Sequence, residues 1–546
     1  MLHPVVFNTS ELCAHHGVRY AVMSPGSRNA PLTLSFARND KVKKFIIPDE
    51  RSAAFVGIGV SQVNDNAPVA LCCTSGTALL NYGPAVAEAY YRQIPLVVFS
   101  ADRPPELIDQ RDGQTIRQFE ALKNHVKASY QLPVVKTAAD AELYQRILEE
   151  GINAAKALPP GPVHFNIPFE EPFYPETKDE LTFIPFKESA TDTVETVETD
   201  IPDLDSYRRV LLLIGQHQTD LSLEPVIKEV SGIIPVISPP LSNQKSGIQN
   251  TDAFIDEQTA LKPDLLITYG LSVLSKKLKN FIRNHKPEKH FHLDPAGVPV
   301  DTFETSPEIL RMSLATFLKS NSFPHADSIY RDQWITFSEK AGQGIDGFLS
   351  GAKFSEIVAV KSVLDQIPEG SNVHLANSMP VRYPDLLGVP KGLTWFSNRG
   401  TSGIDGCTST AVGSALMSEK LNVLITGDLA FLYDRNAFFH NYTLPNLRVI
   451  VLNNQGGGIF RLIKGPSQLP ELETYFETRH NKTARYICEE NSMNYQAIRS
   501  LEDLNDLSNF WTPSENGKIL EIFTDPDTNQ SVYKELRKTI YEQIKN

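Results

Sequence analysis

The sequence predicts an α/β protein made of three doubly wound parallel-sheet domains. Short apolar runs alternate with helical patterns along most of the chain, and this alternation is typical of parallel sheets covered by helices. The alternation falls into three separate stretches, and a chain of 546 residues is too long for one ordinary hydrophobic core. Polar and glycine residues also gather directly after the apolar runs, where open parallel sheets bind their ligands.

The first predicted domain comprises residues 1–185, in which apolar runs are followed by turns or by helical patterns. These segments are RYAVMSPGSR (19–28), FIIPDE (45–50) with the helical pattern RSAAFVGIGVSQ (51–62), PVALCCTSGTALLNYGPAVAEAYY (68–91) and IPLVVFSADRPPE (94–106). Residues 186–203 are predicted to form a linker, because they are acidic, rich in threonine and poor in large apolar residues.

A middle domain is predicted for residues 204–345 and a third domain for residues 346–546. The strand candidates of the middle domain are VLLLIG (210–215), IIPVIS (233–238), DLLITYG (264–270) and HFHLDP (290–295). Those of the third domain are NVHLANS (372–378), LTWFSNRG (393–400), NVLITGD (422–428) and RVIVLNNQ (448–455), with a helical candidate at 402–418.

The composition excludes several classes of function. The formal net charge is −13, which disfavours nucleic acid as a partner because nucleic-acid binding needs a basic footprint. The sequence contains neither the ~18 consecutive apolar residues of a membrane span nor the pattern of a signal peptide, so we expect a cytoplasmic protein. Its five cysteines form no CxxC pair, and the adjacent Cys72 and Cys73 are expected to be buried thiols of a strand.

The strongest motif lies in the third domain, where two predicted neighbouring strands end in polar residues. Gly427 and Asp428 end the first of them, and Asn453 and Asn454 end the second. Both polar groups should therefore lie at one edge of the sheet, where Asp428 and Asn454 offer the hard oxygen ligands that Mg²⁺ prefers. A helix that opens after Asp428 would present free N–H groups to an anion, and the glycines at 456–458 permit close backbone approach.

Four arginines follow predicted strands in this acidic protein, in the segments SPGSR, SADRPPE, NSMPVR and SNRG. They are Arg28, Arg103, Arg382 and Arg399. A single arginine at a strand end can be a surface ion pair that contributes little to stability. Four of them at the predicted ligand edge indicate carboxylate recognition, because a guanidinium pairs with a carboxylate through two parallel hydrogen bonds.

Together these segments resemble the thiamine-diphosphate-dependent enzymes, and within them the synthases of menaquinone biosynthesis. The resemblance covers nearly the whole chain in the order pyrimidine-binding domain, middle domain and diphosphate- and Mg²⁺-binding domain. It implies a transferase of the transketolase type that uses thiamine diphosphate and Mg²⁺, with Mn²⁺ as a possible substitute. It further implies that 2-oxoglutarate is decarboxylated and that a succinyl semialdehyde carbanion equivalent adds to isochorismate in a 1,4 sense, with release of CO2.

The same resemblance implies roles for individual residues of the cofactor site. Glu50 would be the catalytic carboxyl group against N1′ of the aminopyrimidine. Asp428, Asn454 and the carbonyl group of Gly456 would bind the metal ion. The other residues implied to contact the cofactor are Ser75, Gly76, Gly427, Leu429 and Ile404, the last as the apolar wedge beneath it. In relatives, the glutamate and the metal ligands meet across a subunit interface, which implies a homodimer or a dimer of dimers.

The substrate site implied by the resemblance combines polar and apolar side chains. The polar set comprises the four arginines above with Gln114, Ser378 and Lys276, and the apolar wall beside isochorismate comprises Ile459, Phe460 and Ile463. The sequence departs from the family pattern at Leu429, Pro380, Gln455 and Arg461, and none of these departures removes a group that the chemistry needs.

The sequence also allows simpler interpretations of these residues. Glu50 is also compatible with an exposed acid in a first helical turn, Lys276 with a solvated lysine, and the apolar residues with core packing. Two other functions compete: a thiamine-dependent 2-oxoacid lyase similar to acetolactate synthase, and a non-catalytic nucleotide-binding α/β protein. The arginine set disfavours the first, because a small monocarboxylate donor does not require it. The absence of GxGxxG and GxxxxGK[ST] strings disfavours the second.

Overall fold

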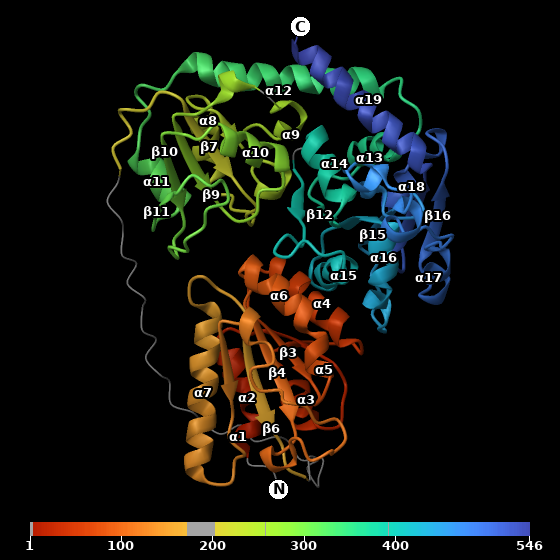
Figure 1. Ribbon diagram of the computed structural model, residues 1–546. Helices are drawn as coiled ribbons and strands as arrows, with labels where there is room; N and C mark the ends of the chain where they lie inside the picture. Colours follow the sequence, from red (N-terminus) through yellow and green to blue (C-terminus); the bar gives the residue numbers. More distant parts are fainter. Residues whose placement is uncertain (1–3, 172–201, 257, 391, 546) are drawn as a thin grey trace. The chain divides into compact units, whose positions relative to one another are not determined.

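The computed structural model describes residues 4–171, 202–256, 258–390 and 392–545, and these form three parallel sheets with flanking helices (Figure 1). The predicted fold class is therefore confirmed. Residues 186–201 of the expected linker lie outside the described residues, and the domain boundaries stay predictions. The chain divides into two compact units, which are described separately: residues 1–193 with 398–419 and 433–444, and residues 194–397 with 420–432 and 445–546.

The first unit contains a six-stranded parallel sheet with the order β2-β1-β3-β4-β6-β5. Its strands are β1 Tyr20–Met23, β2 Lys43–Ile46, β3 Val69–Cys73, β4 Leu96–Asp102, β5 Ala128–Gln131 and β6 Val163–Pro168. Its helices include α1 Pro4–Phe7, α2 Thr9–His15, α3 Ala30–Ala37, α4 Glu50–Gln62, α5 Ala78–Asn81, α6 Gly83–Arg92 and α7 Ala138–Lys156. Every residue of β3 and β4 is buried, as expected for strands covered on both faces. Cys72 and Cys73 are thus core thiols, as predicted.

A helix from the third predicted domain also belongs to this unit. Helix α15, Cys407–Met417, packs along α4. The two backbones approach closely because each helix presents a glycine at the contact. A Cβ atom added to Gly59 would overlap the carbonyl oxygen of Thr410, and one added to Gly413 would overlap the carbonyl oxygen of Val56. The close approach therefore depends on the absence of both side chains.

The second unit contains the other two sheets. The middle sheet has the order β11-β10-β9-β7-β8, and the third sheet has the order β13-β12-β14-β15-β17-β16. The strands of the middle sheet are β7 Val210–Ile214, β8 Val236–Ile237, β9 Leu265–Tyr269, β10 Lys289–Leu293 and β11 Glu308–Leu310. The strands of the third sheet are β12 Asn372–Leu375, β13 Thr394–Phe396, β14 Asn422–Gly427, β15 Leu447–Asn453, β16 Asn494–Ile498 and β17 Lys518–Phe523. Their helices include α8 Glu224–Ser231, α9 Thr251–Phe254, α10 Lys276–Asn284, α11 Leu314–Ser320, α12 Ser328–Leu349, α13 Glu356–Leu364, α14 Met379–Leu387, α16 Asp428–Tyr433, α17 Arg485–Glu490, α18 Ser508–Trp511 and α19 Pro526–Lys545.

The long helices α12 and α19 join these two sheets into one body, and Figure 1 shows them crossing. Trp334 of α12 and Leu536 of α19 are fully buried in a single hydrophobic cluster. The same cluster contains Leu211 of the middle sheet and Val423 of the third sheet. Helix α12 runs through the expected boundary at residues 345 and 346.

The close approach of α4 and α15 leads to a prediction about stability. Gly59→Ala should lower the free energy of unfolding by about 1–3 kcal/mol, because the new methyl group meets backbone that cannot move aside easily. The midpoint of thermal unfolding measures this. Gly342→Ala in α12 is the control, because an added Cβ there meets nothing within 4 Å. That variant should be neutral or slightly stabilised, and equal midpoints for the two variants would contradict the packing argument.

Candidate active site

The carboxyl ends of β14 and β15 bring two oxygen-bearing side chains together. The strands pair in parallel with Gly427 opposite Leu452, so Asp428 and Asn454 leave the sheet at the same edge. The backbone N–H of Gly456 donates to Asp428 Oδ2 at 3.0 Å and to Asn454 Oδ1 at 3.1 Å. Both oxygens therefore converge within hydrogen-bond distance of one atom, as the sequence predicts for this edge.

This arrangement fits a hard divalent cation. Asp428 and Asn454 are buried, and each offers the kind of oxygen that Mg²⁺ prefers. Two side-chain oxygens and a neighbouring carbonyl group leave positions for diphosphate oxygens. Among the described residues, no cluster of three or more histidine, cysteine or acidic side chains could hold a metal ion, so a zinc-type site has no support there.

Glu50 is the first residue of α4, the helix that follows β2 in the chain. Asp49 caps the helix by accepting a hydrogen bond from the backbone N–H of Ser52 at 3.2 Å. Partial burial raises the pKa of Glu50, and the charge of Asp49 raises it further, although a backbone hydrogen bond opposes this. The carboxyl group thus holds a proton more readily than an exposed glutamate does, which suits proton transfer.

A second group of predicted site residues lies in the first unit, in the loops at the carboxyl ends of β1, β3 and β4. The Arg28 guanidinium is buried and donates to the carbonyl oxygen of Phe169 at 2.8 Å. Arg103 donates through Nε and Nη2 to the carbonyl oxygen of Gly113, at 3.1 and 2.8 Å. The next residue, Gln114, has a φ of 55°, and its backbone would lie 3.3 Å from a Cβ atom on Gly76.

In the third sheet, Ser378 and Arg382 follow β12. The carbonyl oxygen of Ser378 accepts a hydrogen bond from Arg382 Nη1. Ser378 has φ 77° and ψ −132°, a backbone conformation that non-glycine residues rarely adopt. Such strain gathers at functional sites, because only a well-packed surrounding maintains it.

Comparison with known proteins shows which family the chain belongs to. Residues 8–122 match the family model described as the thiamine pyrophosphate enzyme, N-terminal TPP binding domain. Curated relatives that match nearly the whole chain carry the name 2-succinyl-5-enolpyruvyl-6-hydroxy-3-cyclohexene-1-carboxylate synthase. The one from Cytophaga hutchinsonii is 43% identical over 98% of this chain and 99% of its own. The one from Flavobacterium johnsoniae is 38% identical over 97% and 98%, and the one from Bacteroides fragilis is 34% identical over 97% of both chains.

The chain belongs to this synthase family. It is a thiamine-diphosphate-dependent enzyme, as the sequence predicts. No helix among the described residues has the length and apolar character needed to cross a bilayer.

Two departures from the synthase pattern have a structural explanation. Pro380 lies in the first turn of α14, where a helix leaves backbone N–H groups unpaired in any case. Arg461 is buried and forms ion pairs with Glu473, Glu477 and Asp527. Its charge is therefore used within the protein, and it does not add to the arginines that could bind substrate carboxylates.

The remaining predicted residues are placed individually by the structure. Lys276 is exposed at the first position of α10. Phe460 lies in the short helix Gly458–Arg461 and contacts Phe476 with ring centroids 5.8 Å apart, whereas Ile463 is 43% exposed. In the first unit, Ile404 is 37% exposed and Ser75 is buried. Glu50, Arg28, Arg103, Gln114 and Arg399 belong to the first unit. The predicted metal ligands Asp428, Asn454 and Gly456 belong to the second unit, as do Ser378 and Arg382.

The structure also contains buried polar residues that contact predicted site residues and that the sequence did not indicate. The Gln118 side chain accepts from the N–H of Gly76 at 2.6 Å and donates to Asn166 Oδ1 at 2.9 Å. Asn166 in turn donates to Asp102 at 2.7 Å, directly before Arg103. Glu356 is buried beside Asn454, and burial raises its pKa to about 7, partly offset by hydrogen bonds from Tyr383 and Asn454. No motif surrounds these residues, so only the tertiary contacts reveal them.

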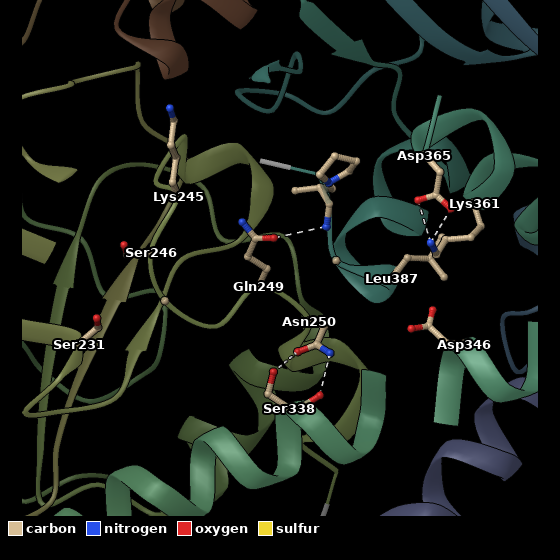
Figure 2. A pocket seen from close by; sticks show the side chains of 14 residues that line it. Ser231, Lys245, Ser246, Gln249, Asn250, Ser338, Asp346, Lys361, Asp365 and Leu387 are labelled. Carbon is tan, nitrogen blue, oxygen red and sulfur yellow. Dashed lines mark hydrogen bonds and ion pairs between the residues drawn. The ribbon is translucent and has the colours of Figure 1, made fainter. Parts of the chain in front are cut away.

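A cavity of about 770 Å³ in the second unit is separate from these residues (Figure 2). Two pairs of its polar side chains interact: Lys361 pairs with Asp365 at 2.7 Å, and Asn250 exchanges hydrogen bonds with Ser338. Gln249 accepts from the N–H of Val389 at 3.3 Å. No predicted site residue is among the residues that line the cavity.

The convergence at Gly456 leads to a prediction about metal binding. Asp428→Asn should weaken thiamine diphosphate binding at least tenfold in the presence of Mg²⁺, because it removes the anionic ligand. Without Mg²⁺, the variant should bind the cofactor at least as well as the wild type, because it lacks a carboxylate that would repel the diphosphate. Titration calorimetry measures both affinities. The control is Asp434→Asn, which changes another buried aspartate that accepts from Ser409. An Mg²⁺-dependent affinity that Asp428→Asn leaves unchanged would exclude Asp428 as a ligand.

Proposed function

We propose that this chain converts 2-oxoglutarate and isochorismate into 2-succinyl-5-enolpyruvyl-6-hydroxy-3-cyclohexene-1-carboxylate and CO2, a step of menaquinone biosynthesis. The observation that carries the proposal is the match over nearly the whole chain to synthases of that name. The residues that this chemistry needs are present at strand ends in both units. A lyase similar to acetolactate synthase would have no use for the arginine set.

When bound, thiamine diphosphate supplies the electron sink for decarboxylation and carbon–carbon bond formation. Asp428, Asn454 and the carbonyl group of Gly456 would hold Mg²⁺, or Mn²⁺ in its place. Ser75, Gly76, Ile404, Gly427 and Leu429 would contact the cofactor. Glu50 would hold a proton at N1′ of the aminopyrimidine, and its raised pKa supports that role.

The arginines would orient the substrates, which carry two carboxylates each. Arg28, Arg103, Arg382 and Arg399 are the candidates, with Gln114, Ser378 and Lys276 as further polar contacts. Ile459, Phe460 and Ile463 would form an apolar wall that keeps water from the reacting atoms. Hydrogen bonds to backbone carbonyl groups hold the guanidinium groups of Arg28 and Arg103 in place. A side chain that is already fixed loses little conformational entropy when the substrate binds, which supports this role.

We also propose a cytoplasmic location and a homodimer or dimer of dimers. All five cysteines are free and buried, which suits a reducing compartment. Exposed apolar side chains on α5 and α6, namely Leu80, Tyr90 and Tyr91, support an association between subunits. Light scattering of the purified protein measures the assembly.

The test of the proposed function combines the purified chain with Mg²⁺, thiamine diphosphate and both substrates. CO2 release coupled to the loss of isochorismate is expected. Release of CO2 that does not depend on isochorismate would indicate a plain decarboxylase. Turnover of pyruvate in preference to 2-oxoglutarate would indicate the acetolactate-synthase type.

Glu50→Gln should lower turnover by about 10²–10⁴-fold, because an amide cannot exchange the proton that general acid–base catalysis needs. Cofactor affinity in the presence of Mg²⁺ should change little. Asp49→Asn is the matched control, since asparagine also caps a helix well and Asp49 is adjacent. A rate assay under substrate saturation compares the two variants, and full activity of Glu50→Gln would remove the catalytic role.

Arg103→Met should raise the KM of at least one substrate by about 10–100-fold, because a charge-assisted hydrogen bond contributes about 1.5–3 kcal/mol. The control is Arg117→Met, which removes an exposed arginine that pairs with Asp109. Steady-state kinetics with each substrate varied in turn measure the effect. Unchanged KM values for both substrates would show that Arg103 binds neither.

A further inference from the structure

Glu356 forms a direct contact with a proposed metal ligand in the second unit. Its Oε1 atom accepts a hydrogen bond from Asn454 Nδ2 at 2.5 Å. Its other oxygen, Oε2, accepts from the Tyr383 hydroxyl group at 2.7 Å. The Glu356 side chain is 3% exposed, so water does not compete for either oxygen.

The contact decides which way the Asn454 amide group points. An ionised carboxylate only accepts hydrogen bonds, so the amide nitrogen of Asn454 faces Glu356 when that group is ionised, as the donation from Nδ2 shows. The amide oxygen then faces the opposite side, where it accepts from the N–H of Gly456 at 3.1 Å, beside Asp428. A flipped amide would present N–H groups to the cation and would place two oxygens against each other at Glu356.

Glu356 is itself held from several directions. It is the first residue of α13, and its backbone N–H donates to Asn529 Oδ1 at 2.9 Å. Tyr383, which donates to it, is buried within α14, the helix that also carries Arg382. Because both carboxylate oxygens are engaged, Glu356 is placed to orient a ligand and not to bind the cation itself.

We propose that Glu356 is a positioning residue for the metal site, which fixes the Asn454 amide so that its oxygen faces the cation. Tyr383 supports Glu356 by holding the far carboxylate oxygen. The inference rests on the proposed function for the identity of the site, but its test measures metal binding directly.

The neighbouring asparagine provides a matched control. Asn453 Nδ2 donates to Glu521 Oε1 at 2.7 Å, and Glu521 is fully buried. Both glutamates therefore hold an asparagine of the same pair at the end of β15. Only Asn454 directs its amide oxygen toward Asp428 and Gly456, so the two glutamates should differ in their effect on the metal ion.

The experiment measures Mn²⁺ binding to the full chain with thiamine diphosphate present, from the electron paramagnetic resonance signal of free Mn²⁺. Glu356→Met keeps the length of the side chain and removes the acceptor, so Mn²⁺ should bind about 10–100-fold more weakly. Glu356→Gln retains one acceptor oxygen and should restore most of the affinity. Tyr383→Phe should weaken binding less than Glu356→Met does. At saturating Mn²⁺, kcat of Glu356→Met should return close to the wild-type value.

Glu521→Gln should lower the thermal midpoint without changing the affinity for Mn²⁺. The proposal is overturned if Glu356→Met binds Mn²⁺ like the wild type, or if Glu521→Gln weakens binding equally. Should Glu356→Met fail to fold, unchanged affinity in Tyr383→Phe would overturn it. A wild-type chain that binds Mn²⁺ but does not consume isochorismate would reject the proposed reaction alone, and the comparison of variants would still decide the role of Glu356.

Discussion

The shared hydrogen bond from the N–H of Gly456 to Asp428 and Asn454 is the constraint on which the proposed metal site depends. It draws the loops after β14 and β15 together, so that two oxygens meet at one point. The position tolerates only glycine, because an added Cβ would lie 2.7 Å from the carbonyl oxygen of Glu477. The side chain of Glu477 is paired with Arg461, and its carbonyl oxygen accepts from the N–H of Gly457 at 2.8 Å. The turn is therefore held against a segment that Arg461 anchors.

The partners of the arginines separate substrate-binding candidates from structural ones. Arg28, Arg103 and Arg382 donate to the backbone carbonyl oxygens of Phe169, Gly113 and Ser378. Carbonyl groups hold a guanidinium group in place without cancelling its charge. The acidic partners of Arg28 and Arg103 are exposed to solvent, so these ion pairs neutralise the two arginines only in part. Arg461 instead meets three carboxylates at once. In a chain with a net charge of −13, this difference makes Arg28, Arg103 and Arg382 better candidates than Arg461 for binding an anionic substrate.

The sequence predicted those parts of the molecule that depend on local pattern. Apolar runs such as 69–73 predicted buried strands, and the polar residues after β14 and β15 predicted that Asp428 and Asn454 meet at one edge of the sheet. The strands β5, β6, β11, β16 and β17 were not among the predicted strands. For β16 the reason is local, because its residues are polar and mostly exposed at the edge of the sheet. The contact between Glu356 and Asn454 spans 98 residues, and an acid at the start of a helix has no distinctive pattern. The packing of α15 on α4 was not predicted either, because Gly59 and Gly413, which permit it, are far apart in the sequence and come together only in the folded chain.

Buried acids in this enzyme serve largely to hold other groups in place. Asp102 accepts from the N–H of Arg103 at 2.7 Å, and Glu88 accepts from the N–H groups of Gly400 and Thr401, directly after Arg399. Glu356 does the same for Asn454. A buried carboxylate is costly unless it is hydrogen-bonded, and each of these accepts at least two hydrogen bonds. The loops supply hydrogen-bond donors to the buried acids, and the acids in turn hold the loops in place. A site assembled in this way spends less of its binding energy on ordering its own side chains, and more of it is available to orient two dicarboxylates.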